Sequence, residues 1–308
     1  MLSYQKGIVK TSVRHLVEFL LRTGSITTGS ALSANPEAML EGGRLHRKIQ
    51  RTQKATYQSE VPLKMEWQEE GYILVLEGRA DGIDRMNLEG ENVVYVDEIK
   101  CVYRNIEEIE EADFLHLAQA KCYAYMYGHK HDLEKIGIQI TYCHLETEEI
   151  KRIFSVYSME ELSLWFADLL DSYRMWASYY VAARKQRNES IKQLKFPFDF
   201  RPGQKKMTAI VYQAMESKKH IFLQAPTGVG KTISTIYPAL KELGEEKAEN
   251  IFYLTAKTIT RTVAEDTIKL LRKQGLSVSA VTITAKEKIC IQKEVQCNPE
   301  SCERAKGH

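Results

Sequence analysis

The chain has 308 residues, a formal net charge of +2, and 27% charged and 44% hydrophobic residues. This composition is that of a soluble globular protein with room for two domains, and it excludes a strong overall basic field as the basis of nucleic-acid binding. The sequence has neither an apolar run near the ~18 residues of a membrane span nor a signal-peptide segment, which predicts a cytoplasmic protein with no membrane partner.

The first part of the chain alternates between helical and strand-like patterns. Helical periodicity is expected over residues 12–22, about 36–53, 112–127 and 159–193, and strands over 61–67, 72–77, 93–96, 136–144 and 152–157. The first three strands are expected to form an antiparallel meander. Together these elements predict an α+β domain over residues 1–157, followed by a helical connector over 158–195.

The second part begins after Phe196–Pro202, where two prolines end the helical pattern. Strand-like runs at residues 221–224, 251–255 and 278–284 alternate with helical runs at 231–243 and 258–273. This alternation predicts a parallel α/β sheet. We expect this domain to cover residues 196–288, with a cysteine-bearing segment over 289–308.

A glycine-rich loop joins the first of these strands to the first helix and predicts a nucleotide-phosphate site. Its residues are Ala225, Pro226, Thr227, Gly228, Val229, Gly230, Lys231 and Thr232. The loop backbone and the helix N-terminus would cradle phosphates, Lys231 would reach the β- and γ-phosphates, and Thr232 would bind Mg²⁺. Ala225 stands where the usual pattern has its first glycine.

Acidic residues and a lysine end two strand-like runs of the first part. Asp81 follows one run, and Glu98 and Lys100 lie two residues apart on the other, so that these two share a face. Asp81 with Glu98 offers a hard oxygen site for Mg²⁺ or Mn²⁺, which can activate water at a phosphate. Lys100 would orient the nucleophile or stabilise the transition state. A solvated strand face is the alternative for an isolated pair of this kind.

This constellation resembles the RecB-like branch of the PD-(D/E)xK nuclease fold. Matching features in the same order are the helix from Ser12, the histidine His46, G-x-x-D at Gly78–Asp81, E-x-K at Glu98–Lys100 and Q-x-x-x-Y at Gln119–Tyr123. The resemblance implies that His46, Asp81 and Glu98 are metal ligands and that Lys100 is catalytic. It also implies that Gln119 and Tyr123 contact DNA or brace the site.

Gln204 lies about twenty residues before the phosphate loop, after the aromatic Phe198 and Phe200. Helicases of superfamily 2 have an aromatic residue and a glutamine at this place to read adenine. A glutamine amide can make two hydrogen bonds to an adenine edge, which favours ATP. A linker with a chance glutamine is the alternative.

Cys290, Cys297 and Cys302 cluster near the end of the chain. Thiolates are ligands for iron–sulfur clusters and zinc. With the phosphate loop, their order resembles the DinG/XPD-type DNA helicases, in which four cysteines hold a [4Fe–4S] cluster inside the motor domain. The resemblance implies that the chain is the N-terminal part of a longer protein with its fourth ligand beyond His308. Alternatively, His308 completes a zinc site of three cysteines and one histidine.

The sequence has no D-E-A-H-like acidic box after the phosphate loop. Without that carboxylate to hold Mg²⁺ and orient water, ATP is expected to bind but to be hydrolysed very slowly by this chain. The combined patterns predict an ATP-dependent DNA helicase fused to a metal-dependent nuclease that acts in DNA repair or processing. Two rivals remain: an inactive nuclease-fold module that clamps DNA, and an unrelated P-loop ATPase with a zinc knuckle. Oligomeric state is not indicated.

Overall fold

The computed structural model describes residues 3–5, 7–25, 36–256 and 258–307. The chain divides into two compact units, one of residues 1–178 with 284–308 and the other of residues 179–283. His308, a ligand of the alternative zinc site, lies outside the described residues. Among the residues that are described, no helix is long and apolar enough to cross a membrane.

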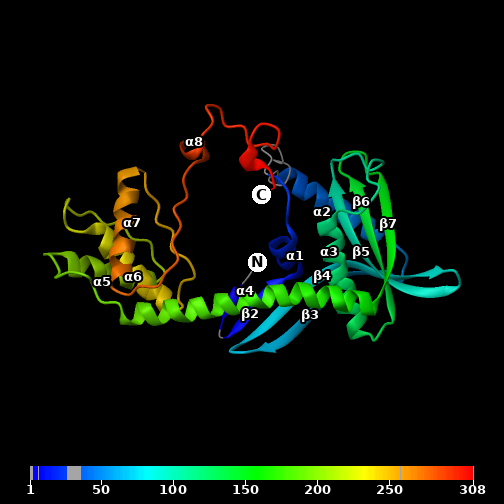
Figure 1. Ribbon diagram of the computed structural model, residues 1–308, viewed down its shortest axis with the longest axis horizontal. Helices are drawn as coiled ribbons and strands as arrows, with labels where there is room; N and C mark the ends of the chain where they lie inside the picture. Colours follow the sequence, from blue (N-terminus) through cyan, green and yellow to red (C-terminus); the bar gives the residue numbers. More distant parts are fainter. Residues whose placement is uncertain (1–2, 6, 26–35, 257, 308) are drawn as a thin grey trace. The chain divides into compact units, whose positions relative to one another are not determined.

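A mixed seven-stranded sheet forms the centre of the first unit (Figure 1). Its strands are β1 (Ser3–Gln5), β2 (Ile8–Ser12), β3 (Gln58–Glu69), β4 (Tyr72–Leu88), β5 (Glu91–Val102), β6 (Lys135–His144) and β7 (Ile150–Ser158). The order is β1-β2-β4-β5-β6-β7, with β3 on β4. The pairs β2–β4 and β5–β6 are parallel and the others antiparallel, so the expected meander β3–β4–β5 is confirmed.

Opposite faces of β5 carry different helices. The helix α2 (Pro36–Arg51) packs Leu45 and Ile49 against Ile99 in a buried cluster. The helix α3 (Phe114–Lys130) has its Gln119 in contact with Lys100, the next residue along β5. Because successive side chains of a strand point to opposite faces, α2 and α3 cover the two faces of the sheet. Each fully buried aliphatic side chain in these layers stabilises the fold by about 2 kcal/mol.

Two further helices complete the described frame of the first unit. The short helix α1 (Val13–Leu21) follows β2 and begins at Ser12, whose hydroxyl accepts a hydrogen bond from the His15 backbone N–H. This is the N-cap interaction that serine favours. The long helix α4 (Met159–Gln193) has the bounds that the sequence predicts and buries Leu162, Phe166 and Tyr173 in its first half.

The second unit is helical. It contains the end of α4 and the helices α5 (Gln204–Glu216), α6 (Lys231–Gly244) and α7 (Thr258–Lys273). Its core joins side chains from α4, α6 and α7, namely Ile191, Ile233, Ile236, Leu240, Leu243 and Leu271, with Leu194 and Leu276. The two helices predicted after the phosphate loop are therefore confirmed.

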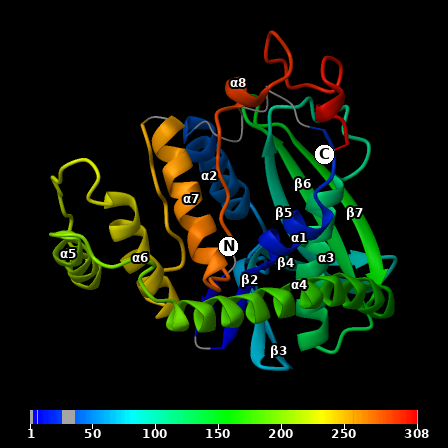
Figure 2. The ribbon, with the colours of Figure 1, turned by 60° about the vertical axis from the view of Figure 1, so that its left-hand side comes forward.

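The parallel sheet expected in this second part is not formed. Residues 221–224, 251–255 and 278–283 have no strand pairing, and the segments between α5, α6 and α7 carry no strand arrows in Figure 2. Their apolar side chains lie in solvent: Phe222 is 98%, Leu254 89% and Val281 84% exposed. Apolar composition favours strands, but a strand forms only when a neighbour satisfies its backbone N–H and C=O groups. Among the described residues of this unit, no segment supplies such a ladder.

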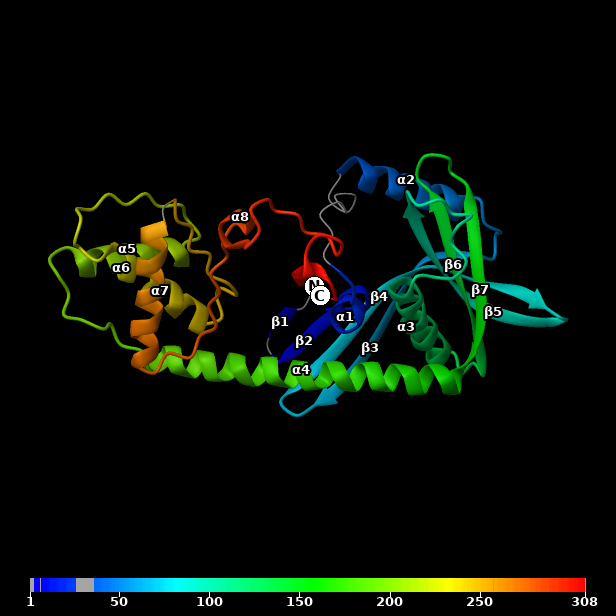
Figure 3. The same cartoon turned by 45° about the horizontal axis from the view of Figure 1, so that its top comes forward.

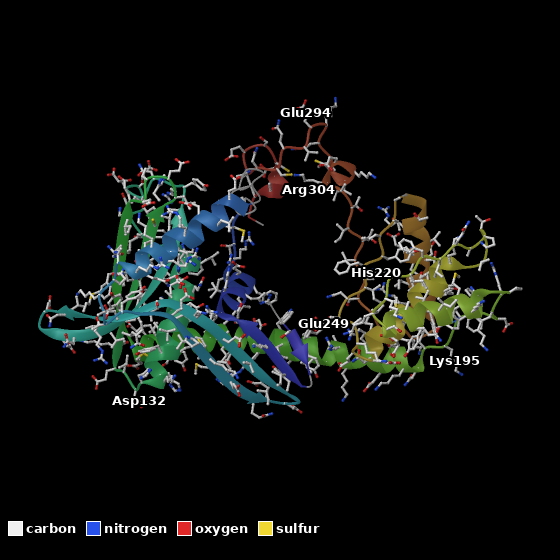
Figure 4. The ribbon with its side chains drawn as sticks, turned by 180° about the vertical axis from the view of Figure 1, so that it is seen from behind. Asp132, Lys195, His220, Glu249, Glu294 and Arg304 are labelled. Atoms are coloured by element: carbon white, nitrogen blue, oxygen red, sulfur yellow. The ribbon has the colours of Figure 1, made fainter. Side chains whose placement is uncertain are left out.

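The C-terminal segment of the chain carries the cysteine cluster. It has one short helix, α8 (Lys286–Ile289), and one 3-10 turn, η2 (Glu303–Ala305). Figure 4 labels Glu294 and Arg304 on it. Short turns joined by irregular chain make up the rest.

Candidate functional sites

The strand β4 changes its partner in the middle of one edge (Figure 3). Residues 73–77 pair with β2, and residues 82–88 pair with β5. The four residues between them, Gly78–Asp81, have no partner strand on that edge. The sheet therefore opens at the G-x-x-D motif, and side chains from several elements gather at this opening.

Asp81 and His46 meet at the opening, as the resemblance to RecB-like nucleases implies. The Nε2 atom of His46, on α2, lies 3.1 Å from Oδ2 of Asp81. The same carboxylate oxygen accepts a hydrogen bond of 2.7 Å from the backbone N–H of Ile99. That bond ties Asp81 across the gap to β5, beside Glu98. The hydrogen bond that the His46 ring N–H donates to Asp81 is the main cause that raises the pKa of His46 above its usual value.

Glu98 and Lys100 occupy the α3 side of the opening. Glu98 is 1% exposed and its Oε1 lies 2.6 Å from Nζ of Lys100. Lys100 also donates a hydrogen bond of 3.3 Å to Oε1 of Gln119 on α3. The E-x-K pair and the first residue of the Q-x-x-x-Y motif are thus in direct contact.

The second oxygen of Glu98, Oε2, is buried without a hydrogen-bond partner among the described residues. Burial, followed by the nearby Asp81 carboxylate, raises the pKa of Glu98 to about 8. A buried carboxylate oxygen without a partner is costly unless a cation or donor satisfies it. Carboxylates with an imidazole suit Mn²⁺ or Mg²⁺, so His46 and its neighbouring acids fit a divalent cation. Among the described residues at this opening, the ligand atoms that lie within 4.8 Å of one another belong to His46, Asp81 and Glu60, and Glu98 lies outside that group.

Tyr123 stacks against the backbone at the start of the opening. A side chain at Gly78 would place its Cβ 2.5 Å from a ring carbon of Tyr123, so only glycine admits the ring. The hydroxyl of Tyr123 faces Gln119 and the backbone of Arg79, and burial raises its pKa above the usual value. The tyrosine is 4% exposed. Its ring therefore fills the space above Gly78.

Asp84 and Asp97 lie in the middle of the sheet. They belong to the paired strands β4 and β5 and are 5% and 0% exposed. Asp97 accepts hydrogen bonds from Tyr57 at 3.0 Å and Thr141 at 2.6 Å. Hydroxyl donors from distant parts of the chain thus satisfy the buried Asp97 carboxylate, and no local sequence pattern reveals them.

The phosphate loop adopts the backbone that its glycines permit. Gly228 and Gly230 have φ angles of +84° and +81°, in the left-handed region that favours glycine. Gly230 caps the N-terminus of α6, whose first residue is Lys231. The ammonium group of Lys231 donates to the backbone oxygens of Ala225 at 2.8 Å and Pro226 at 3.0 Å. Lysine, loop and helix N-terminus thus converge as anion binding requires.

Gln204 lies behind the loop rather than in solvent. It is 2% exposed, and its Oε1 accepts a hydrogen bond of 3.0 Å from the Arg201 backbone. A side chain at Gly230 would collide with its amide nitrogen. The Arg201 guanidinium donates to the backbone oxygen of Gly228. The adenine-reading role of Gln204 stays a prediction, whereas its contact with the loop is direct.

The cysteine cluster does not form a closed single-ion site. Cys290, Cys297 and Cys302 are free and partly buried. The sulfur atoms of these three described residues do not all lie within 4.8 Å of one another. Tetrahedral zinc with Zn–S bonds near ~2.3 Å needs sulfurs closer than that, and the fourth ligand of the zinc alternative, His308, lies outside the described residues.

Three contacts in these sites were not anticipated from the sequence. Glu60 on β3 is grouped with His46 and Asp81, Gln50 bonds the backbone of Asp81, and Arg201 holds the phosphate loop. Glu60 is one of several charged residues on an edge strand and therefore carries no distinct pattern. Arg201 lies close to Gln204 in a stretch that is otherwise aromatic. This basic residue could have indicated the contact with the phosphate loop.

Comparisons with known proteins bear on the second part of the chain. Residues 201–301 match the DEAD/DEAH box helicase family. A probable ATP-dependent helicase of Methanocaldococcus jannaschii is 43% identical over 47 residues, which are 15% of this chain and 7% of that protein. The chain thus carries a helicase-type ATP-binding region, and the matched segment spans a small part of the relative's length.

A solved structure is similar to the chain at a low level. The crystal structure of SSO0001 has a TM-score of 0.37 and 19% sequence identity, covering 56% of this chain and 78% of that one. At this TM-score the likeness shows neither a shared fold nor a shared site.

Proposed function

We propose that the chain combines a divalent-cation-dependent DNA nuclease centre with the ATP-binding region of a DinG/XPD-type DNA helicase. The observation that carries the nuclease part is the opening beside β4. There His46, Asp81, Glu98 and Lys100 come together from α2, β4 and β5. A nuclease tethered to a motor meets single-stranded DNA at a raised local concentration.

The reaction proposed for this centre is phosphodiester hydrolysis. A bound Mg²⁺ or Mn²⁺ would lower the pKa of water and offset charge on the phosphate. His46, Asp81 and Glu98 would hold the cation, and Lys100, fixed by Glu98 and Gln119, would direct its ammonium at the phosphate oxygens. The water oxygen forms a bond to phosphorus, one ester P–O bond breaks, and the water proton passes to the leaving oxygen.

The proposal for the second unit is ATP binding for DNA translocation. The contacts of Lys231 and Arg201 with the phosphate loop support it, as does the helicase match over residues 201–301. Gln204 would read adenine. We further propose that Cys290, Cys297 and Cys302 ligate a [4Fe–4S] cluster. A protein containing zinc but no iron or sulfide after anaerobic purification would contradict the cluster.

The nuclease proposal is tested by cleavage of single-stranded DNA in Mn²⁺. We expect the double variant Asp81→Ala, Lys100→Ala to lose at least about 100-fold in rate, the range of one essential charged group. The matched control is Glu91→Ala, Lys135→Ala, which removes an exposed ion pair of the same charges from the same unit. The control should cut at the wild-type rate.

The outcome also decides between the enzyme and the inactive clamp. Equal cleavage by wild type and the Asp81, Lys100 double variant would show that the activity comes from elsewhere. Retained DNA binding with no cleavage by the wild type in Mn²⁺ or Mg²⁺ would favour the clamp.

A further inference from the structure

Glu60 faces the candidate cation site from the strand next to Asp81. Ser59 pairs with Gly82 and Val61 with Ala80, so Glu60 stands at the register position opposite Asp81. Its φ angle is +57°, in the left-handed region that is uncommon for residues other than glycine. The backbone of β3 therefore departs from regular strand geometry at the residue that faces the site.

The imidazole of His46 lies between two carboxylates. Its Nε2 is 3.1 Å from Oδ2 of Asp81, and its Nδ1 is 3.8 Å from Oε1 of Glu60. Ligand atoms of these three residues all lie within 4.8 Å of one another. Each ring nitrogen of His46 thus faces the carboxylate of a different residue.

Both oxygens of Glu60 have further partners. The Gln50 amide donates to Oε1 at 3.0 Å and also to the backbone oxygen of Asp81 at 2.9 Å. The guanidinium of Arg79 donates to Oε2 at 3.1 Å. The positive charge of Arg79 offsets the negative charge of Glu60. Gln50 contacts both acids and so fixes the distance between Glu60 and Asp81. A carboxylate with these partners is better suited to accept an imidazole N–H than to bind a cation directly.

We propose that Glu60 is a positioning residue for His46. It accepts the Nδ1–H of the imidazole, which leaves the Nε2 lone pair directed at the side of Asp81 where the cation binds. Histidines that ligate metals generally donate their other ring N–H to a carboxylate or carbonyl, and loss of that partner costs 10–100-fold in metal affinity or activity. Nδ1 and Oε1 are 3.8 Å apart, and this role requires a closer approach, to hydrogen-bond length, in the cation-bound protein. The role rests on the proposed function, because it uses His46 and Asp81 as ligands.

The test is calorimetric titration of the whole chain with Mn²⁺. Glu60→Gln should bind Mn²⁺ about 10–100-fold more weakly than wild type with unchanged stoichiometry, and saturating Mn²⁺ should return DNA cleavage close to the wild-type rate. Glu60→Asp should fall between the two. Glu66→Gln is the matched control, since Glu66 lies on the same strand and pairs with Lys64 away from the site.

Each result has a distinct meaning. If wild type and Glu60→Gln bind Mn²⁺ equally, the positioning role is overturned and the nuclease proposal stands. If wild type binds two Mn²⁺ ions and Glu60→Gln binds one, Glu60 is a ligand and the positioning role is again overturned. If the wild type binds no Mn²⁺, the proposed nuclease centre fails first. Tryptophan fluorescence checks folding, because Trp67, Trp165 and Trp176 all lie in the first unit.

Discussion

The two units reach their candidate sites by different routes. In the first, strand register forms the site. The strand β4 pairs first with β2 and then with β5, and side chains that are distant in sequence lie at the unpaired residues between these two pairings. In the second, the phosphate loop takes its shape from two glycines and a helix N-terminus, although no described residue of that unit belongs to a paired strand. A site formed by strand register should lose its geometry when core packing is disturbed. A site formed by a local loop should change mainly when its own residues are substituted.

The largest expected effect is on the packing of the first unit. Tyr57 occupies the space that a side chain at Gly82 would need, and its hydroxyl bonds the buried Asp97. We expect Gly82→Ala to displace Tyr57, leave a buried acceptor without its donor, and lower the free energy of unfolding by about 3 kcal/mol. Urea unfolding followed by tryptophan fluorescence reports on this unit alone, since residues 179–308 contain no tryptophan.

The control for this packing prediction is Gly42→Ala. The nearest atom to an added Cβ at Gly42 is at 3.8 Å, an ordinary contact. In helix α2 an alanine is neutral or stabilising by up to about 1 kcal/mol. A Gly82→Ala protein as stable as the wild type would contradict the register-dependent account of the site.

The second effect concerns ATP affinity. Lys231 makes two charged hydrogen bonds to the loop and would turn its ammonium to the phosphates when ATP binds. Its replacement in Lys231→Ala should weaken binding of a fluorescent ATP analogue at least about 100-fold, because bonds to a charged group contribute about 1.5–3 kcal/mol each and 1.4 kcal/mol is tenfold.

For the ATP prediction, Lys206→Ala removes an exposed lysine of the same unit and should bind the analogue as wild type does. Tryptophan-monitored stability of the first unit should be unchanged in both lysine variants. Equal ATP affinity of wild type and Lys231→Ala would remove the phosphate-site assignment.

Sequence reasoning predicted what depends on local pattern or on an ordered set of motifs. The bounds of α4, the helices that follow the loop, and the contact of Glu98 with Lys100 belong to this class. The helix periodicity is local, and residues two apart on a strand share a face whatever surrounds them.

What the sequence missed depends on pairing between distant segments. The strand β2 is five residues long and lies parallel to β4, a pairing that no turn between adjacent strands indicates. Glu60 gains its place only from the β3–β4 register. Residues 221–224 have strand-like composition, yet composition states only that a segment fits a sheet, not that a partner is present.

A smaller effect is expected from pH on the α3 side of the first unit. His116 contacts the hydroxyl of Tyr142 at 3.1 Å, and burial, followed by the charge of Lys100, lowers its pKa to about 4. The unfolded chain binds the proton near pH 6.5, so stability is present above pH ~6.5 and lost as pH falls toward 4. With 1.36 kcal/mol per pKa unit and a partly exposed ring, the loss should be about 2 kcal/mol.

This pH dependence is measured by urea unfolding at pH 7 and pH 4.5. His116→Asn should lose less stability over this range than the wild type, while His131→Asn, at the exposed end of α3, should behave as the wild type does. Identical pH dependence of His116→Asn and wild type would show that another group is responsible.

The smallest effect separates two roles for Tyr123, contact with DNA and bracing of the strand. Because its side chain is 4% exposed and its ring fills the space above Gly78, bracing is expected. Tyr123→Phe should lower the stability of the first unit by about 1 kcal/mol through loss of hydroxyl bonds, while DNA affinity stays unchanged. Tyr127→Phe, one turn further along α3, is the control and should alter neither. Unchanged stability with weaker DNA binding would instead mean that the tyrosine leaves the gap to meet the substrate, and the opening beside β4 would then be a surface that rearranges rather than one preformed by register.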